Sequence, residues 1–369
     1  MRFSVSQSSL AQAITIVLKG VTTISTAPVL SGILFTAKEG SVTLQTTNIK
    51  VAIKHTIEAA VDEEGSCVVS GAFVAKLIKN LPNAPVVFES NDAQTQISCL
   101  KSVYQLAVLN SFDFPEFPQL QESQTIELPS ELLSQMVERL YRVTKQDVSN
   151  PILEGITLVA QENKLSMFAT DSHRLAIVDT HTDFASPKEE FTCIIPASCF
   201  HEILNLPNIS ETLHIGLSDN QVIFKFQNTT YISRKIEGSF PAYQNLFPKV
   251  CNTKISVNPE LLSESIRRVA LVTTNNNLGV HFDVKPDAQT ITLHANSNEI
   301  GVSQEDLPAK IEGNPISFAM NYQYILECAK STTNSDELAF EVVDSFQPIT
   351  IKSFGTFNYQ CLLIPLRTN

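Results

Sequence analysis

The sequence predicts an α+β protein made of three tandem copies of one domain, each with two helices and an antiparallel sheet. The main observation is that the chain matches itself when it is shifted by 123 residues, which places Pro28 on Pro151. The same shift superposes further positions: Leu10 on Leu133, Leu30 on Leu153, Gly32 on Gly155, Ile33 on Ile156, Leu44 on Met167 and Thr47 on Thr170. Solenoid units span roughly 20 to 50 residues, so this period is that of a domain with its own core.

A weaker third copy supports the same organisation. Its matching positions are Leu133 with Leu262, Gly155 with Gly279 and Met167 with Leu293. The tyrosines Tyr104, Tyr231 and Tyr359 also recur at nearly equal spacing. A length of 369 residues allows two or three domains, and the repeat favours three. We expect domains at 1–124, 125–252 and 253–369, joined by the polar stretches that follow FPEFPQLQ and LFPKVCN.

The hydrophobic period changes in a fixed order along the first repeat. Strand-like alternation at the start gives way to helical spacing from Leu10 to Val21. Alternating stretches at 28–48 and 50–61, broken by Gly40 and by Thr47-Asn48, predict antiparallel strands. A second helix is expected at 71–82 and ends at Pro82. Its apolar stripe comprises Phe73, Leu77, Ile78 and Leu81, and strands follow at 86–90, 96–100 and 104–109.

The other repeats show the same order of elements. Strands of the second repeat are expected at 151–159, 164–180, 213–217, 222–226 and 231–237. Helices are expected at 129–144 and 196–207 in the second repeat, and at 258–273 and 321–331 in the third. The prediction is therefore two helices per domain and six per chain.

Composition indicates a globular protein of the cytoplasm. The chain is 43% hydrophobic and 17% charged, with no run of about 18 apolar residues and no long apolar stretch at its start. Seven scattered cysteines without a C-x-x-C pair argue against a disulfide framework and a zinc site, and no metal or cofactor is expected. The net charge of −12 argues against nucleic acid over the whole surface, although a positive patch can lie within it.

Cations recur on the polar sides of the predicted helices. They are Lys76 and Lys79; Arg139, Arg142 and Lys145; and Arg267 and Arg268. The spacing places the members of each group on one helical face. An ordinary solvated face is the alternative for any single helix, but recurrence in all three repeats favours a shared role. If the helices line a channel, these cations would contact phosphates without reading base sequence.

The turn in the second repeat departs from the pattern of its equivalents. We equate Thr47-Asn48, Thr170-Asp171 and Asn296-Ser297, so Asp171 is interpreted as a turn-forming residue rather than a catalytic acid. The repeat does not account for His173 and Arg174. A lone histidine is usually structural, although its chemistry suits proton transfer near neutral pH, and no nucleophile or metal ligand is spaced to support it.

Two other classes of function are compatible with a repeated fold. A hydrolase using Asp171 and His173 lacks G-x-S-x-G, H-E-x-x-H and the G-x-x-x-x-G-K-[ST] phosphate loop, so no enzyme is predicted. The other class is a monomeric scaffold that has the same three-domain fold and binds peptides, and the sequence leaves this alternative open. Its mass in solution would distinguish it from a dimer.

The three tandem copies, ATDSHRLA at 169–176, FPAYQNLFP at 240–248 and LLIPLR at 362–367 together resemble the bacterial DNA sliding clamp family, the beta subunit of DNA polymerase III. The resemblance covers the whole chain and implies the DNA clamp fold. It implies a head-to-tail homodimeric ring around duplex DNA, which holds the polymerase on its template and is opened by an ATP-driven clamp loader. The implied partners are the DNA polymerase III catalytic subunit, the loader, other polymerases, and mismatch-repair or ligase proteins.

The resemblance also implies a hydrophobic cleft for short linear peptides. Its expected residues are Leu153, Thr170, Ser172, His173, Arg174, Leu175, Pro241, Asn245, Leu246, Pro348, Leu362, Ile364 and Leu366. Such clefts commonly form at domain junctions. Alternatively, Leu362, Ile364 and Leu366 are strand residues that face a core. Both roles can hold, because alternate positions of a strand face opposite sides. Family members often have arginine at Asn245 and methionine at Ile364 and Leu366, which indicates a stiffer pocket here.

A ring of two copies needs a contact between domain one and domain three of the next chain. The resemblance places Phe73, Leu77, Tyr104 and Leu106 on one side and Leu271, Val272, Glu299 and Glu305 on the other. Ordinary core and surface roles remain the alternative, and two head-to-tail copies would close with twofold symmetry. Relatives often carry basic residues at the positions of Ala197 and Ser198, and some carry arginine near Ile24. These differences indicate a weaker grip on DNA.

Overall fold

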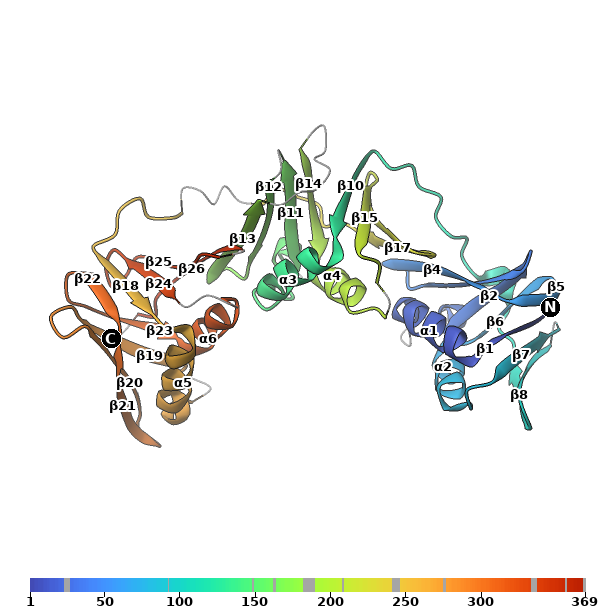
Figure 1. Cartoon of the computed structure of the whole chain (residues 1–369), viewed down its shortest axis with the longest axis horizontal. Helices are drawn as coiled ribbons and strands as arrows, with labels where there is room; N and C mark the ends of the chain where they lie inside the picture. Colours follow the sequence, from blue (N-terminus) through green and yellow to red (C-terminus); the bar gives the residue numbers. More distant parts are fainter. Residues whose placement is uncertain are drawn as a thin grey trace. The chain divides into compact units, whose positions relative to one another are not determined.

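A computed structural model describes most of the chain (Figure 1). It covers residues 1–22, 27–91, 93–147, 149–161, 164–181, 190–207, 209–240, 246–274, 277–332, 337–355 and 357–367. Internal contacts divide the chain into two units, Met1–Leu133 with Ser198–Lys235, and Ser134–Ala197 with Ile236–Asn369. The middle repeat therefore contributes to both units. Among the described residues, no helix is long and apolar enough to cross a membrane.

The first repeat contains nine strands and two α-helices within its described residues. In order they are β1 (Arg2–Ser6), α1 (Gln7–Val17), β2 (Gly32–Lys38), β3 (Ser41–Thr47), β4 (Val51–Glu58), β5 (Ala60–Glu63), β6 (Gly65–Ser70), α2 (Gly71–Asn80), β7 (Pro85–Ser90), β8 (Gln94–Cys99) and β9 (Ser102–Ala107). Short 3-10 turns, η1 (Leu18–Gly20), η2 (Pro28–Ser31) and η3 (Ser111–Asp113), lie between them.

The second repeat follows the same order. Its elements are β10 (Gln124–Pro129), α3 (Ser130–Tyr141), η4 (Pro151–Glu154), β11 (Gly155–Gln161), β12 (Lys164–Thr170), β13 (Arg174–His181), β14 (Phe191–Pro196), α4 (Ala197–Leu204), β15 (Thr212–Leu217), β16 (Gln221–Phe226) and β17 (Thr229–Arg234).

The third repeat closes the chain with a further copy. Its elements are β18 (Thr253–Val257), α5 (Pro259–Val269), η5 (Ala270–Val272), β19 (Gly279–Lys285), β20 (Thr290–Ser297), β21 (Gly301–Pro308), β22 (Lys310–Gly313), β23 (Ile316–Asn321), α6 (Tyr322–Lys330), β24 (Leu338–Val342), β25 (Ile349–Ser353) and β26 (Asn358–Leu363). All six predicted helices are present in the described chain, two in each repeat.

Helix ends follow from local chemistry. α1 begins after Ser6, whose side chain accepts a hydrogen bond from the Ser9 amide, and α5 begins after Asn258, which accepts from two amides of the first turn. The helical stripe predicted as far as Val21 is too long, because α1 ends at Val17. Phe73 was also wrongly placed on the apolar stripe of α2. It is half exposed, and Val74 is buried in its place.

β6 and β14, which enter the sheets directly before α2 and α4, are among the strands that the sequence did not predict. Three successive residues of β6, Cys67, Val68 and Val69, are buried, so the strand is covered on both faces. A strand of this kind shows a continuous apolar run rather than alternation, and a short apolar run does not distinguish strand from helix.

Each unit contains one large and one smaller antiparallel sheet. In the first unit the strand order is β10-β15-β16-β17-β4-β3-β2-β6, with a second sheet β5-β1-β7-β8-β9. In the second unit the order is β14-β11-β12-β13-β26-β25-β24-β18-β22, with a second sheet β21-β20-β19-β23. Each large sheet therefore crosses from one repeat to the next through one strand pair, β17 with β4 or β26 with β13.

Strand register aligns the repeats more closely than the sequence does. Tyr104 lies opposite Ile97 on β8, and Tyr231 lies opposite Phe224 on β16. The corresponding residue of β26, opposite Ile351, is Cys361. The proposed equivalence of Tyr359 with Tyr104 and Tyr231 is therefore wrong by two residues, and the spacing of the third tyrosine is coincidental.

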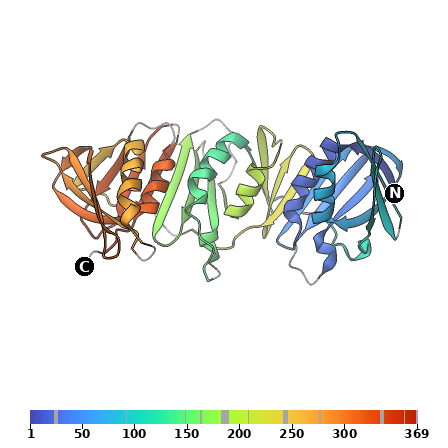
Figure 2. The same ribbon diagram turned by 90° about the horizontal axis from the view of Figure 1, so that it is seen from below.

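Helices pack in pairs within each unit (Figure 2). α1 contacts α2 and covers β3 and β4, while α5 contacts α6 and covers β20 and β21. Phe88 stacks on Phe3 and Phe35 in the first core, and Phe282 stacks on Phe318 in the third repeat. Burial of these aromatic side chains contributes to the stability of the first and third repeats.

Candidate functional site

The turn that joins β12 to β13 is held by its own side chains. The Thr170 hydroxyl donates to the Arg174 carbonyl over 2.7 Å, and Asp171 Oδ1 accepts from the His173 and Arg174 amides, each at 3.0 Å. Ser172 has a φ of 74°. These contacts confirm that Asp171 is a turn-forming residue.

The equivalent turn of the first repeat has the same geometry. Asn48 Oδ1 accepts from the Lys50 and Val51 amides, and Ile49 has a φ of 75°. In the third repeat Ser297 Oγ accepts from the Glu299 amide, as Thr47 Oγ1 does from the Ile49 amide. Strand register nevertheless equates Asn296 with Thr47, in agreement with the sequence alignment, because Leu293 lies opposite Phe282 as Leu44 lies opposite Phe35. The turn of the third repeat is one residue longer, since Asn296 lies opposite Val302 whereas Thr47 lies opposite Ala52.

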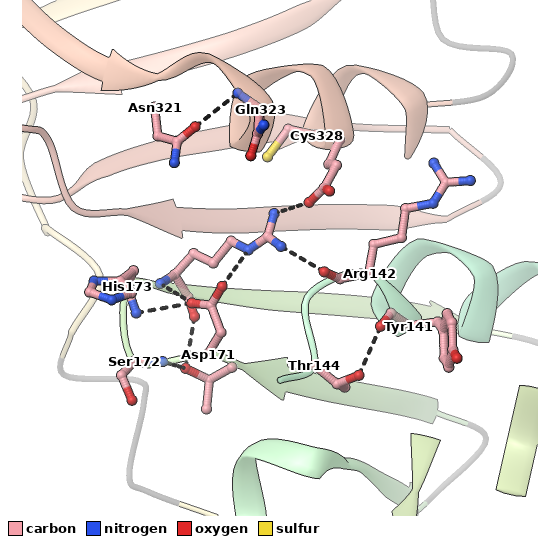
Figure 3. Close-up of polar contacts among 12 residues, drawn as sticks. Tyr141, Arg142, Thr144, Asp171, Ser172, His173, Asn321, Gln323 and Cys328 are labelled. Atoms are coloured by element: carbon pink, nitrogen blue, oxygen red, sulfur yellow. Dashed lines mark hydrogen bonds and ion pairs between the residues drawn. The ribbon is translucent and has the colours of Figure 1, made fainter. Parts of the chain in front are cut away.

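Arg174 belongs to a buried polar network, and two of its partners, Asp171 and Arg142, are labelled in Figure 3. Its side chain is 4% exposed, and Nε donates to Asp171 Oδ2 over 3.0 Å. Nη1 pairs with Glu327 of α6, and Nη2 donates to the Arg142 carbonyl over 2.6 Å. The guanidinium also lies over the Tyr324 ring, 4.2 Å from its centroid. Burial opposes the charge, but Glu327 and Asp171 outweigh it and raise the pKa of Arg174.

This network corrects the expectation that Arg174 forms a wall of the peptide cleft. All three guanidinium nitrogens have partners inside the protein. The exposed residues of the turn are its neighbours, Ser172 and His173. The sequence could not show this, because the acceptors come from the end of α3 and from α6, far from the turn in the chain.

An apolar cluster lies where β13 pairs with β26. Leu175 is opposite Leu362, and both are buried together with Phe168 and Ile177. Three partly buried residues, Val159, Phe240 and Phe247, pack against this cluster. Two of the expected cleft residues are thus brought together across the strand pair that joins the second repeat to the third.

The segment after β26 lies beside the turn. The Ile364 amide donates to the His173 carbonyl over 3.1 Å, and the Leu366 amide donates to the Ala319 carbonyl over 2.8 Å. Ile364 is 52% exposed, and the Leu366 side chain is also exposed. Leu362 therefore faces the cluster, whereas Ile364 and Leu366 present apolar side chains to solvent.

The remaining expected cleft residues are distributed around this strand pair. Leu153 is buried, Thr170 and Pro348 are half-buried, and Leu246 is exposed. None of these four belongs to the buried cluster among the residues that the structure describes. Pro241 and Asn245 lie outside the described residues, as does Ile24.

Phe346 is a candidate site residue that the sequence pattern did not single out. It is 77% exposed and lies in the turn before β25, close in sequence to Pro348. Asp344 Oδ1 fixes this turn by accepting from the Phe346 and Gln347 amides. The D-S-F-Q-P sequence carries the signal for such a turn, because aspartate bonds the backbone two residues ahead.

The predicted cations differ in their surroundings. Lys76, Lys79 and Arg267 are exposed on their helices, and within the described chain none of them has an ion-pair partner. The expectation that Arg139, Arg142 and Lys145 share a helical face is wrong, because α3 ends at Tyr141. Arg142 and Lys145 are exposed beyond that end.

Arg139 and Arg268 are engaged within the chain. Arg139 lies over the Phe357 ring, 4.5 Å from its centroid, and burial lowers its pKa. Arg268 binds both carboxylate oxygens of Glu305, through Nε at 3.0 Å and Nη2 at 2.7 Å. The carboxylate of Glu305 and the guanidinium of Arg268 are therefore partly neutralised by each other, which neither predicted role had anticipated.

The expected interface residues lie on or near two strands at sheet edges. β9, with Tyr104 and Leu106, is the last strand of the smaller sheet in the first unit. β21, with Glu305, is the last strand of the smaller sheet in the second unit. Phe73, Leu271 and Glu299 are exposed, Val272 is half-buried, and Leu77 is buried in α2, so Leu77 is placed as a core residue.

Comparison with known proteins covers the chain from end to end. Family models of the DNA polymerase III beta subunit match in order: the N-terminal domain at residues 1–118, the central domain at 127–242 and the C-terminal domain at 244–367. The beta sliding clamp of Staphylococcus aureus is 29% identical, and that of Synechococcus elongatus is 25% identical. Each alignment covers 100% of this chain, with 100% and 99% of the relative.

Among solved structures, the DNA polymerase sliding clamp of Bacillus subtilis superposes with a TM-score of 0.93 at 27% identity, with 100% of both chains covered. This likeness confirms the predicted fold class of three tandem clamp domains. With three consecutive family models matched, the chain belongs to the DNA polymerase III beta subunit family, the sliding clamps that serve as its processivity factors.

Proposed function

We propose that two copies of the chain close head to tail into a ring around duplex DNA, through β9 of one protomer and β21 of the other. The observation that carries this proposal is the rule that joins the repeats inside the chain. The last strand of repeat two, β17, pairs with β4 of repeat one, and the last strand of repeat three, β26, pairs with β13 of repeat two. In the described structure, β9 is the last strand of repeat one and lies at a sheet edge, and β21 is the equivalent of β4 and β13 in repeat three and also lies at a sheet edge.

The internal junctions also give a register for the contact between chains. Tyr231 lies opposite Ile53, and Cys361 lies opposite Ala176. Tyr104 occupies the position of Tyr231, and Ser303 occupies that of Ile53 because it lies opposite Ala295 as Ile53 lies opposite Thr46. We therefore place Tyr104 opposite Ser303 of the partner.

Exposed apolar side chains on both edges support this pairing. The register places Gln105 opposite Val302, which is 76% exposed, and Ser102 opposite Glu305. Unpaired edge strands with exposed apolar residues readily take up another strand. Tyr104 and Val103 of β9 are likewise exposed.

The helices support sequence-independent contact with DNA. The six α-helices contain six acidic and six basic residues, so they are neutral while the whole chain carries −12. The acidic surplus therefore lies on strands and loops. We assign phosphate contact to the exposed cations Lys76, Lys79, Arg142, Lys145 and Arg267, with Arg139 and Arg268 acting mainly through their intrachain contacts.

We infer that the exposed surface around Leu175 and Leu362 receives linear peptide motifs. Ile364 lies beside the polar turn at His173, Leu366 follows it in the chain, and Phe346 precedes β25, whose Ile349 lies opposite Leu363. Exposed apolar side chains next to a polar turn suit the binding of short hydrophobic segments. The partners we assign are the DNA polymerase III catalytic subunit, the clamp loader, other polymerases, and mismatch-repair or ligase proteins. In this proposal the chain acts in the cytoplasm as a subunit of the DNA polymerase III assembly, which is a nucleotidyltransferase, and it contributes no active site to that assembly.

Disulfide crosslinking tests the ring and its register together. The double variant Gln105→Cys/Val302→Cys is expected to give covalent dimers under mild oxidation, because directly opposed residues of an antiparallel pair come within disulfide distance. The matched control Gln105→Cys/Asp306→Cys keeps the same sheet face but is shifted along the strand, and it should stay monomeric on a non-reducing gel. A wild-type chain that sediments as a monomer would favour the monomeric scaffold.

Retention on DNA tests encirclement independently of the interface. A crosslinked dimer closed around nicked circular DNA by the loader should remain bound, and it should leave when the DNA is linearised. Equal retention on both forms would show that the chain binds DNA without a ring.

A further inference from the structure

We propose that Arg174 is a positioning residue of the peptide-binding surface, which it braces from inside the protein without contacting the peptide. This inference rests on the proposed function of that surface. It concerns how the exposed turn at Ser172 and His173 and the segment after β26 keep one shape in the free protein.

The bracing begins in the turn itself. Asp171 uses Oδ1 for the His173 and Arg174 amides and Oδ2 for the Arg174 guanidinium. The same carboxylate therefore fixes the backbone of the turn and the side chain beneath it. Rotation of Asp171 would release both sets of contacts at once, so the Arg174 guanidinium holds the carboxylate in the orientation that the turn needs.

The bracing continues to two other elements of the unit. Nη1 of Arg174 pairs with Glu327, and the guanidinium lies over the ring of Tyr324; both residues are on α6. Nη2 donates to the Arg142 carbonyl just after α3. That carbonyl lies beyond the last helical residue, where main-chain acceptors lack partners within the helix. One guanidinium thus joins the turn to two helices.

The C-terminal segment depends on the same turn. The His173 carbonyl accepts from the Ile364 amide, and this bond places Ile364 beside the turn. A change in the His173 backbone would therefore move the apolar rim formed by Ile364 and Leu366. Fixing these groups before the peptide arrives reduces the ordering cost of binding.

The equivalent residue of the first repeat shows what the turn can do without a brace. Val51 takes the place of Arg174, and the Asn48 turn has the same backbone bonds. The turn therefore does not require arginine in order to form. We infer that Arg174 fixes the turn against α3 and α6 at the one internal junction where a peptide is bound.

The test compares binding and backbone exchange in the same variants. Arg174→Met removes all three donors, and Glu327→Gln removes one carboxylate charge with little change in shape. Binding is measured with a fluorescein-labelled hydrophobic peptide from the DNA polymerase III catalytic subunit, and amide hydrogen exchange is followed by mass spectrometry. Lys254→Met, at the exposed position of β18, is the control for loss of a cation.

We expect peptide affinity to fall about tenfold or more in Arg174→Met and about threefold in Glu327→Gln, since buried charged contacts are strongly coupled. Exchange should accelerate in segments 169–176 and 360–367 but not in α5. Arg174→Lys should recover part of both effects. Lys254→Met should match the wild type.

Two results would overturn the positioning role. One is wild-type affinity in both variants. The other is weakened binding with unchanged exchange in the two segments, which would make Arg174 a direct peptide contact. If Arg174→Met does not fold, Glu327→Gln decides by the same criteria. Failure of the wild-type chain to bind the peptide is a separate outcome that removes the peptide surface itself.

Discussion

Leu175 and Leu362 lie directly opposite each other on β13 and β26, and each is buried although it belongs to a different repeat. Ala52 and Ile232 occupy the same place at the other internal junction, where Phe117 and Leu120 of the connecting segment pack against them. The two junctions share the same strand pairing but differ in their exposed apolar residues: Ile364 follows β26 at the junction formed by Leu175 and Leu362, whereas Ile49 lies in the turn before β4 at the other junction.

Phe346 should contribute directly to peptide binding. Phe346→Ala is expected to weaken binding by about 1–2 kcal/mol, since exposed aromatic anchors often dominate small interfaces. The free energy of unfolding should change little, because the side chain is already solvent-exposed in the free protein. Fluorescence titration with the labelled peptide measures the effect.

Phe354 supplies a matched control at the other end of β25. It is 61% exposed but lies beside the Ser353–Tyr359 end of the strand pair rather than the Ile349–Leu363 end. Phe354→Ala should therefore keep wild-type peptide affinity. Equal losses in the two variants would place the peptide over a different part of the sheet.

Glycines that recur in the repeat should differ in their tolerance of a methyl group. An added Cβ at Gly32 would meet Val68 Cγ1 at 2.4 Å, and one at Gly155 would meet Ile194 Cγ2 at 2.5 Å. Alanine at either position is expected to lower the free energy of unfolding by about 1–3 kcal/mol, the usual cost of overpacking. Urea denaturation followed by circular dichroism measures the change.

Gly279 is the corresponding control in the third repeat. Its added Cβ would lie 3.2 Å from Asn277 Oδ1 and from Leu366 Cδ1, both at the ends of side chains. Gly279→Ala should therefore cost less than the other two substitutions. A larger loss at Gly279 than at Gly155 would contradict this account.

Removal of Arg268, the partner of Glu305, should make the protein unfold at a higher pH during acid titration. Hydrogen bonds from Arg268, then Ser265, lower the pKa of Glu305 to about 2. A carboxyl with a lowered pKa contributes stability above its ordinary value of 4.5, and this contribution is lost as the pH falls toward 2. Arg268→Ala should raise this pKa and shift acid unfolding to higher pH.

Circular dichroism during an acid titration checks this shift. Arg267→Ala serves as the control, because the neighbouring arginine has no ion-pair partner in the described chain. If both variants unfold at the same pH as the wild type, the Arg268–Glu305 pair makes no measurable contribution to stability.

The exposed cations should govern the salt dependence of DNA retention. Replacing Arg142 and Arg267 by alanine is expected to reduce the logarithmic salt slope by about 0.9 for each phosphate that the protein no longer neutralises. Arg268→Ala should leave the slope nearly unchanged, because its guanidinium is already paired with Glu305. Retention of the loaded ring on circular DNA over a salt series measures the slope, and an unchanged slope in the double variant would exclude both arginines from DNA contact.

The sequence predicted the repeated architecture because each copy keeps its apolar positions at a constant offset. It misplaced features that depend on packing between distant elements. β6 was missed since burial on both faces removes alternation, and Arg174 was assigned to the surface because its acceptors on α6 and after α3 are remote in the chain. The equivalence of Cys361, rather than Tyr359, with Tyr231 follows from strand register, which the sequence does not contain.

The junctions have a mechanical consequence for a closed ring. At the two internal junctions the paired strands belong to one covalent chain, and connecting segments contribute Phe117, Leu120, Phe240 and Phe247 to their apolar cover. A separated internal pair would find its partner again at a high effective concentration. If β9 and β21 join two chains as proposed, that seam has no such tether. A ring built from one repeated strand pairing would thus have two kinds of joint, permanent ones within each subunit and detachable ones between subunits, and opening it would require no unfolding.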